Sequence, residues 1–278
     1  MALGGRTLVM GILNVTPDSF SDGGRYLDPS RAVERALQMQ EEGADLIDVG
    51  GESTRPGSDE VDAGEEWRRL KDVLPRLSAS LQVPVSVDTR KSSVAGQALE
   101  AGAEIVNDVS MLRYDPRLAQ TAARYGAGLI LMHSRGYPKT MQDSPAYGDL
   151  WAEILSELSA AAALAESAGV AGGKIVVDPG LGFSKSFDDN LKILRELSRL
   201  HALGRPALVG ASRKSFLGRI LDQPATGRGV GGAVCVAACA LAGVSIVRVH
   251  DVKEAVEAAR VADAIRGAGN PVERPQGP

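Results

Sequence analysis

Short apolar runs that end on one or two hydrogen-bonding residues recur along the chain. Eight such runs end at Asn14, Asp48, Asp88, Asn107, His133, Asp178, Ser212 and His250. A short, continuous apolar run is typical of a strand that is buried on both faces, as in a parallel sheet. The polar residues at its C-terminal end must then face water or a ligand. We therefore expect the chemistry at this row of strand ends.

Helical patterns fill most of the segments between these runs. In four places the helical pattern stops at a glycine suited to a left-handed helix cap, and a strand pattern follows: at Gly43, Gly102, Gly126 and Gly243. We predict helices over residues 30–42, 62–80, 92–101, 149–168, 187–201, 232–242 and 251–266. Strands that alternate with helices indicate parallel pairing through right-handed crossovers.

Eight predicted strands favour an α/β fold of the closed (β/α)8 type, a TIM barrel, over an open doubly wound sheet. An open sheet binds its ligand at one switch point beside a glycine-rich first turn, whereas polar strand ends recur here along the whole chain. In a barrel all of these ends meet at one mouth. No linker divides the sequence. We predict a single domain over residues 1–278, with a loosely ordered tail at 267–278.

Composition and charge narrow the class of partner. Hydrophobic residues make up 44% of the 278 residues, and aromatic residues only 4%, which argues against base-stacking platforms. The net charge of −4 gives no general attraction to polyanions. The start of the chain lacks the pattern of a signal peptide, and no run reaches membrane-spanning length. We expect a cytoplasmic protein that binds small molecules, with no nucleic-acid partner and no membrane association.

The loops after the first two predicted strands are long and rich in glycine, which favours a ligand loop over a surface insertion. Their charged residues include Asp18, Asp22, Glu52 and Arg55. A diphosphate with a divalent cation would use both signs of charge.

The last predicted strand places Arg248 and His250 two residues apart, so both side chains point to the same face. If the barrel closes, they lie next to Asn14 of the first strand and form a site for an anion and a metal-bound phosphate. The alternative is structural: Arg248 forms an ion pair with Asp251 or with a neighbouring carboxylate.

Two further strands end on carboxylates, Asp88 and Asp178. A carboxylate at the mouth accepts paired hydrogen bonds from a guanidine-like edge of a heterocycle, and Asn107 supplies both a donor and an acceptor. The alternative is that either aspartate caps the next helix. Lys214 and Ser215 open a turn or helix and together indicate an anion or carboxylate site.

Two motifs resemble known binding sites but do not meet the requirements of those sites. The glycine-rich segment 227–232 comes late and follows no clear strand, so we predict a flexible loop rather than a dinucleotide site. His133 and His250 lack a third histidine at a strand end, which argues against a zinc site. Cys235 and Cys239 lie four apart on one helical face, and we expect buried thiols.

Eight segments, in this order, resemble motifs of the dihydropteroate synthase family: GILNVTPDSFSDGG, DVGGESTRPG, SVDTRK, NDVS, MH with GYPKTMQ, DPGLGF, GASRKSF and RVHDV. The resemblance covers nearly the whole chain. It implies a (β/α)8 transferase of folate biosynthesis that condenses 6-hydroxymethyl-7,8-dihydropterin diphosphate with 4-aminobenzoate, giving 7,8-dihydropteroate and pyrophosphate. It also implies Mg2+ and a homodimer formed by late helices.

The resemblance assigns roles to individual residues. The pterin would be held by Asp88, Asn107, Met132, Asp178 and Lys214. The diphosphate would be held by Asn14, Arg248 and His250, with the metal at Asn14. The aminobenzoate pocket would be formed by Thr54, Arg55, Pro56, Phe183 and Ser215. Asp22 would complete the site from the first loop, and the catalytic candidates are Asp22, Lys214, Arg248 and His250.

The implied chemistry is a Mg2+-assisted dissociative displacement. A neutralised diphosphate is a good leaving group, the electron-rich dihydropterin stabilises a methylene cation, and the arylamine attacks that cation.

Two alternatives stay open. A pterin-binding methyltransferase of the same superfamily would need no diphosphate site, and a silent regulatory paralogue would have lost one of the binding groups. The sequence departs from the usual family pattern after DPGLGF, where it has Ser184 in place of a common glycine and Asp189-Asn190 in place of a histidine-asparagine pair. We expect these positions to lie at the base of a helix, away from the bound groups, and to affect mainly the loop near Phe183.

Overall fold

The computed structural model describes residues 3–16, 29–53, 58–136 and 146–267. Its strands form one parallel sheet in the order β6-β5-β4-β3-β2-β1-β8-β7. They are β1 (Leu8–Asn14), β2 (Leu46–Gly50), β3 (Val85–Asp88), β4 (Ile105–Asp108), β5 (Gly128–Met132), β6 (Ile175–Asp178), β7 (Leu208–Val209) and β8 (Ile246–Val249). A parallel bridge between Val177 and Ala207 joins the two edges, so the sheet nearly closes. The predicted (β/α)8 barrel is confirmed.

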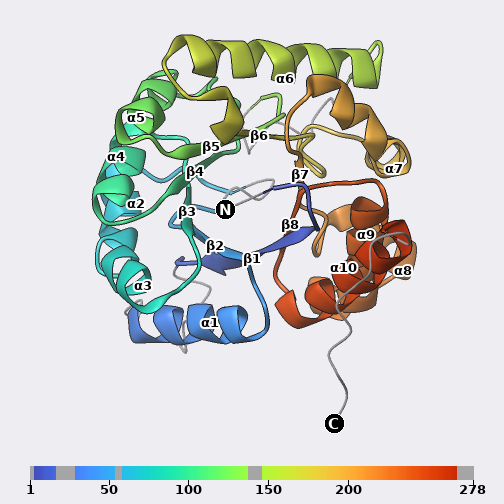
Figure 1. The fold of residues 1–278 in the computed structure, drawn as a ribbon, viewed down its shortest axis with the longest axis horizontal. Coiled ribbons are helices and arrows are strands. Elements are labelled where there is room, and N and C mark those ends of the chain that lie inside the picture. The colour runs from blue at the N-terminus through green and yellow to red at the C-terminus, as the bar shows by residue number, and fades with distance from the viewer. Residues whose placement is uncertain (1–2, 17–28, 54–57, 137–145, 268–278) are drawn as a thin grey trace.

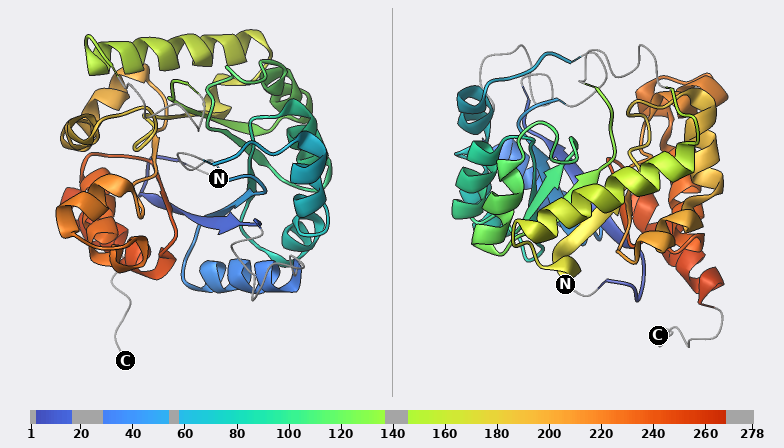
Figure 2. Two further views of the ribbon diagram at one scale, coloured as in Figure 1. Left: turned by 180° about the vertical axis from the view of Figure 1, so that it is seen from behind. Right: turned by 90° about the horizontal axis from the view of Figure 1, so that it is seen from above.

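Helices surround the strands on the outside (Figures 1 and 2). They are α1 (Pro29–Glu41), α2 (Ala63–Leu70), α3 (Leu74–Ser80), α4 (Ser92–Glu100), α5 (Arg117–Tyr125), α6 (Leu150–Ser167), α7 (Phe187–Arg195), α8 (Ser215–Leu221), α9 (Gly229–Leu241) and α10 (Val252–Arg266), with short 3-10 helices η1 (Gly172–Lys174), η2 (Leu197–Leu203) and η3 (Ala225–Gly227). No helix within the described ranges is long and apolar enough to cross a bilayer.

Three element predictions need correction. The helix expected over 62–80 is divided into α2 and α3 because Pro75, in the first turn of α3, has no N–H to continue a helix. The helix expected over 187–201 becomes 3-10 after Arg195. The glycine-rich segment expected to be a loop begins α9 at Gly229. A Cβ at Gly231 would lie 2.8 Å from Leu221, so the glycine lets α9 pack closely on α8.

Side chains inside the barrel follow the two-residue period of each strand. The lower interior is filled by Leu8, Met10, Leu46, Ile130, Val176, Leu208 and Ile246. The alternate residues, such as Val9, Val177 and Val247, pack outward against the helices. Because successive side chains alternate across a strand, the interior-facing positions after these apolar residues lie at the C-terminal mouth.

Candidate active site

The strand register brings the predicted polar residues to the mouth of the barrel. Asp88 pairs in register with Asn107, and Met132 with Asp178. Asn107, Met132 and Asp178 each lie two residues beyond an apolar residue of the interior cluster, and Asp88 lies two residues beyond Ser86, so all four face inward. Arg248 follows the interior residue Ile246 in the same way. The strand register thus places these residues at the same end of the barrel, as the sequence analysis expected.

Arg248 lies at the centre of this group and bridges two carboxylates. Its Nε donates to Oδ2 of Asp48 at 2.6 Å, and a terminal guanidinium nitrogen donates to Oδ2 of Asp88 at 2.8 Å. The Nδ2 of Asn107 also donates to Asp48, at 2.9 Å. The alternative of a neighbouring carboxylate is thus confirmed, but not with Asp251. Arg248 nevertheless faces the mouth, so the ion pairs hold it in the site.

Asp48 is the residue that sequence reasoning missed. Its side chain is fully buried, and it accepts hydrogen bonds from both Arg248 and Asn107. The sequence did carry a signal for a place in the site, because Asp48 ends one of the eight apolar runs.

Burial controls the charge of the central carboxyl group. Burial raises the pKa of Asp88 to about 7, although Arg248 opposes the shift and Asp48 adds to it. The pKa of Arg248 is also raised, because Asp48 and Asp88 outweigh the cost of burying the guanidinium. Within the described residues, Oδ1 of Asp88 and Oδ1 of Asp48 are buried without a hydrogen-bond partner. Buried polar atoms normally have one, so these oxygens are suited to a ligand that donates N–H groups.

Asp178 is fixed by a tight turn at the end of β6. Its Oδ1 accepts a hydrogen bond from the backbone N–H of Gly180 at 2.7 Å. Gly180 has φ +70, and a Cβ there would lie 2.0 Å from the carbonyl oxygen of His133, so only glycine fits. Burial raises the pKa of Asp178 to about 6, opposed by the Gly180 N–H and by Lys214.

Neither aspartate caps a helix, which removes that alternative. The N-cap of α4 is Lys91, without a side-chain cap, and the N-cap of α7 is Ser186.

Lys214 and Phe183 meet on the neighbouring side of the mouth. The Nζ of Lys214 lies 4.2 Å from the centre of the Phe183 ring, a cation–π contact. Lys214 is the N-cap of α8, and Ser215 is the exposed first residue of that helix. A helix start at this point was one of the two predicted possibilities.

His250 and Asn14 complete the described part of the mouth. The Nδ1 of His250 lies 3.1 Å from Oγ of Ser212, which also accepts the His250 backbone N–H at 3.2 Å. Asn14 is the partly exposed last residue of β1. Among the described residues, no group of three or more His, Cys, Asp or Glu side chains is arranged to hold a metal ion.

Several predicted residues lie outside the described residues, namely Asp18, Asp22, Thr54, Arg55, Pro56 and residues 137–142 of the GYPKTMQ segment. Glu52 is described, and its expected role in a ligand loop is wrong. It is buried and forms ion pairs with Arg90 at 2.8 Å and with Lys91 at 2.5 Å. Its oxygens also accept the Val61 N–H at 3.3 Å, so Glu52 holds the end of the loop rather than a ligand.

The histidine and the cysteines for which the sequence analysis predicted no metal site are indeed elsewhere. His133 follows the outward-facing positions of β5 and is fully buried behind the mouth, away from His250. Cys235 and Cys239 are buried, free thiols. Burial raises the pKa of Cys235 to about 11, which makes it unreactive.

Comparisons with known proteins agree with this geometry. A family model described as "Pterin binding enzyme" matches residues 10–250. A dihydropteroate synthase of Synechocystis sp. is 48% identical over 264 residues, covering 94% of this chain and 91% of that protein. The chain belongs to the dihydropteroate synthase family. It is therefore an enzyme of the transferase class.

Solved structures of the dihydropteroate synthase family share the fold. One from Clostridium difficile, in the presence of pteroic acid, has a TM-score of 0.90 at 44% identity and covers 95% of this chain and 98% of that one. One from Xanthomonas albilineans, with 4-aminobenzoic acid, has a TM-score of 0.88 at 42% identity and covers 94% of each chain.

The departures from the usual dihydropteroate synthase pattern lie close to the site loop. Ser184 has φ +51, a conformation that glycine adopts without strain. Asp189 forms a capping box with Ser186 at the start of α7. The Oδ1 of Asn190 accepts the Gly182 N–H at 2.6 Å. Asn190, which the usual pattern shares, thus holds the loop directly before Phe183. Asp189 lies at the base of α7 as expected, whereas Ser184 directly follows Phe183 and so lies nearer the site than expected.

We expect the stability of the unliganded enzyme to fall as the pH rises through the raised pKa of Asp88. The unfolded carboxyl group loses its proton near 3.8, whereas the folded one keeps it up to about 7, so the folded state binds more protons in this range. Urea unfolding between about pH 4.5 and 8 measures the effect. Asp88→Asn should show a smaller loss, and an unchanged pH profile in that variant would contradict the assignment.

Proposed function

We propose that this enzyme condenses 6-hydroxymethyl-7,8-dihydropterin diphosphate with 4-aminobenzoate, forming 7,8-dihydropteroate and pyrophosphate, and that it does so in the cytoplasm. The observation that carries the proposal is the convergence of Asp88, Asn107, Asp178, Lys214 and Arg248 at one mouth. Family relatives solved with pteroic acid and with 4-aminobenzoic acid support the two substrate classes.

The pterin edge is assigned to the buried polar pocket. Asp88 and Asp178 accept N–H groups from the heterocycle, and Asn107 offers both a donor and an acceptor. The free Oδ1 of Asp88 and the burial of this carboxyl group favour a bonded ligand over bulk water. Met132 lines the pocket beside Asp178, with which it pairs in register, and Lys214 reaches in from the start of α8.

The diphosphate is assigned to Arg248, His250 and Asn14. Arg248 is already shared by Asp48 and Asp88, so it is held rigid and needs little reorganisation when the substrate binds.

The site also fits Mg2+. This ion usually takes one or two protein oxygens together with substrate phosphates, rather than a complete protein cage. The amide oxygen of Asn14 at the mouth suits that role. When bound, Mg2+ would neutralise part of the charge on the departing diphosphate.

The aminobenzoate is assigned to Phe183 and Ser215, with Thr54, Arg55 and Pro56 from the second loop. The Phe183 ring supplies an apolar wall, and Ser215 is exposed at the start of α8 for the carboxylate.

The proposed chemistry is a dissociative displacement. The bond between the pterin methylene carbon and the diphosphate oxygen breaks first, and both electrons leave with pyrophosphate. The dihydropterin ring holds the resulting cation, favoured by Asp22 and the buried carboxylates. The aminobenzoate nitrogen then forms the new bond and loses its proton to solvent. Kinetic isotope effects that indicate a tight, associative transition state would contradict this order.

Product detection tests the function. The full chain, both substrates and Mg2+ should give dihydropteroate and pyrophosphate in equal amounts, and chelation of Mg2+ should strongly reduce both. A pterin-binding methyltransferase or a silent paralogue would leave the pterin diphosphate unchanged.

We also propose a homodimer formed through α9 and α10. Two valines on one face of α9, Val230 and Val234, and two residues on one face of α10, Val261 and Ile265, are exposed. The two helices lie side by side at the edge of the barrel (Figure 1). Exposed apolar side chains on two packed helices are typical of an interface when they form one patch.

The doubly substituted variant Val234→Glu/Val261→Glu should be monomeric because it buries charge in the interface. Sedimentation equilibrium measures the mass. Leu164→Glu is the matched control, since Leu164 is an exposed apolar residue on the distant helix α6. A monomeric wild type, or a double variant that stays dimeric, would contradict the proposed interface.

A further inference from the structure

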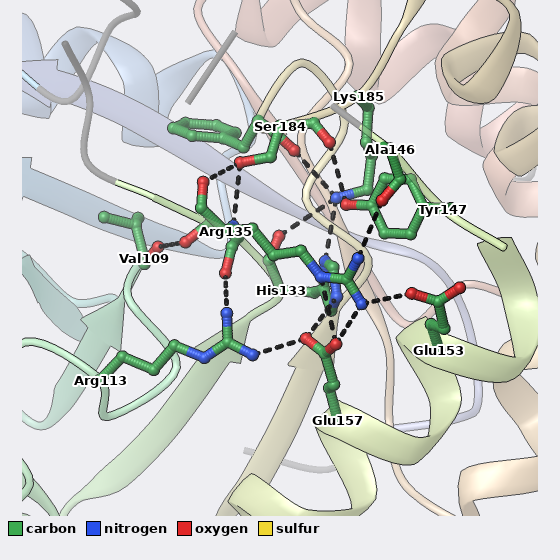
Figure 3. A network of polar contacts seen from close by, with 12 residues as sticks. Val109, Arg113, His133, Arg135, Ala146, Tyr147, Glu153, Glu157, Ser184 and Lys185 are labelled. Carbon is green, nitrogen blue, oxygen red and sulfur yellow. Dashed lines mark hydrogen bonds and ion pairs between the residues drawn. The ribbon is translucent and has the colours of Figure 1, made fainter. Parts of the chain in front are cut away.

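Lys185 is a buried cation behind the active site that none of the proposed substrate contacts uses. It lies at the end of the loop between β6 and α7 and is 3% exposed. Its Nζ donates to the carbonyl oxygen of Phe183 at 2.9 Å and to that of His133 at 3.3 Å, and lies 3.0 Å from Nδ1 of His133 (Figure 3). The amino group of Lys185 therefore has three acceptors, as many as the N–H groups of an ammonium.

These contacts join two neighbouring loops of the mouth. His133 follows β5, whereas Phe183 belongs to the loop after β6. The His133 backbone also contacts the same loop, because a Cβ at Gly180 would meet its carbonyl oxygen. The amino group of Lys185 is thus the point at which the backbone of the Phe183 loop is tied to the end of the adjacent strand.

His133 continues the connection to helix α6. Burial lowers the pKa of His133 to about 3, so its ring is neutral near pH 7. The other ring nitrogen, Nε2, lies 3.0 Å from Oε2 of Glu157 on α6, without the geometry of a hydrogen bond. Burial lowers the pKa of Lys185 to about 7, with Asp178 opposing the shift. The ammonium and the neutral amine both carry N–H groups for the carbonyl oxygen of Phe183.

A second set of contacts holds the same loop from the other side. The hydroxyl of Tyr147 donates to the Ser184 carbonyl oxygen at 2.9 Å, and the Arg135 N–H donates to Oγ of Ser184 at 2.9 Å. The guanidinium of Arg135 lies 4.4 Å from the Tyr147 ring and donates to Glu153 at 2.6 Å. Loop and helix therefore form one polar network, drawn in Figure 3, which includes Ser184, the residue that follows Phe183 in the chain.

We infer that Lys185 is a positioning residue for aminobenzoate: it fixes the backbone of Phe183, and through the Phe183 ring the contact with Lys214. The inference rests on the proposed role of Phe183 in the aminobenzoate pocket. Pterin binding depends less on Lys185, because Asp178 is fixed by strand β6 and by the Gly180 N–H, and Asp88 and Asn107 come from other strands.

Lys185→Met tests the inference, because methionine nearly preserves the volume and removes every donor. The KM for aminobenzoate should rise about tenfold or more, since a displacement of about 1 Å costs up to about a hundredfold. The KM for the pterin diphosphate should stay within about threefold. A purely structural role would lower the folded fraction, which reduces kcat and leaves both KM values unchanged.

Two further lysine variants sharpen the experiment. Lys174→Met is the matched control, because Lys174 is exposed and also donates to a backbone carbonyl, that of Gly126, outside the site. It should leave both KM values unchanged. Lys185→Gln keeps an N–H donor and should recover part of the lost affinity for aminobenzoate. If Lys185→Met does not fold, Lys185→Gln decides, with an expected rise of about threefold in the same KM.

The outcomes separate this inference from the proposed function. If folded Lys185→Met keeps the wild-type KM for aminobenzoate, or if both KM values rise equally, the inference is wrong. Phe183→Ala is measured alongside. If it raises the aminobenzoate KM while the Lys185 variants do not, Phe183 keeps its role and only the inference fails. If Phe183→Ala has no effect on that KM, both fail.

Discussion

Lys214→Ala is expected to lower kcat/KM by about a hundredfold to a thousandfold, the range found when one preorganised charged or polar contact is removed from a site. Lys214 acts on both assigned pockets: its Nζ lies over the Phe183 ring, and its charge lowers the pKa of Asp178 against the effect of burial. Removing it takes away a contact to the pterin and the support of the aminobenzoate wall together. Steady-state kinetics with both substrates measures the loss.

The control for Lys214→Ala is Lys174→Ala, an exposed lysine away from the mouth, whose loss should leave kcat/KM unchanged. Unfolding by urea shows whether the Lys214 variant is folded, which we expect because Lys214 is only partly buried and makes no side-chain cap of α8. A folded variant with near-normal turnover would place the site elsewhere.

Arg248→Met should have the largest effect on stability, a loss of about 3–5 kcal/mol in the free energy of unfolding, as is typical when one partner of a buried ion pair is removed. The side chain of Arg248 is 19% exposed, and its partners Asp48 and Asp88 are 0% and 4% exposed. Their carboxylates would be left buried without a counter-charge. The variant should also lose diphosphate binding, which titration calorimetry with Mg2+ and pyrophosphate measures.

Arg213→Met is the matched control for Arg248, because Arg213 also pairs with an aspartate, Asp251, but at a more exposed position. An exposed pair contributes only about 0–1 kcal/mol. The loss in Arg248→Met should also shrink as the pH falls toward about 7, because without the guanidinium the pKa of Asp88 rises further, and a protonated Asp88 needs no counter-charge. Equal losses for the two arginine variants would contradict the central role of Arg248.

The candidate site could be predicted from the sequence where its residues lie at the ends of the recurring apolar strands. Asp88, Asn107, Asp178 and Arg248 were found because a polar residue that follows a buried strand has few places to point. Asp48 has the same pattern and was not assigned a role, since its importance depends on its contacts with Arg248 and Asn107 across the barrel. Such contacts join residues up to 200 positions apart, which no local pattern encodes.

Charge and exposure in the loops were harder to predict. Glu52 follows a strand, as Asp88 ends one, yet it is buried against Arg90 and Lys91 and serves the loop itself. Lys185 looks like an ordinary loop lysine in the sequence, but the fold buries it between two strand ends. Whether a charged side chain faces a ligand or another side chain is decided by the neighbours that packing brings to it.

The sequence by itself determined the alternation of buried strands and helices, the barrel, the row of polar strand ends and the family, because periodicity and turn residues act over a few positions. Only the tertiary structure decided which of those polar groups pair with one another. It made Arg248 the shared partner of Asp48 and Asp88, left one oxygen of each carboxyl group for a ligand, and tied Phe183 to Lys185. The physical reason is that hydrogen bonds and ion pairs depend on distance in space, and the closed barrel sets those distances.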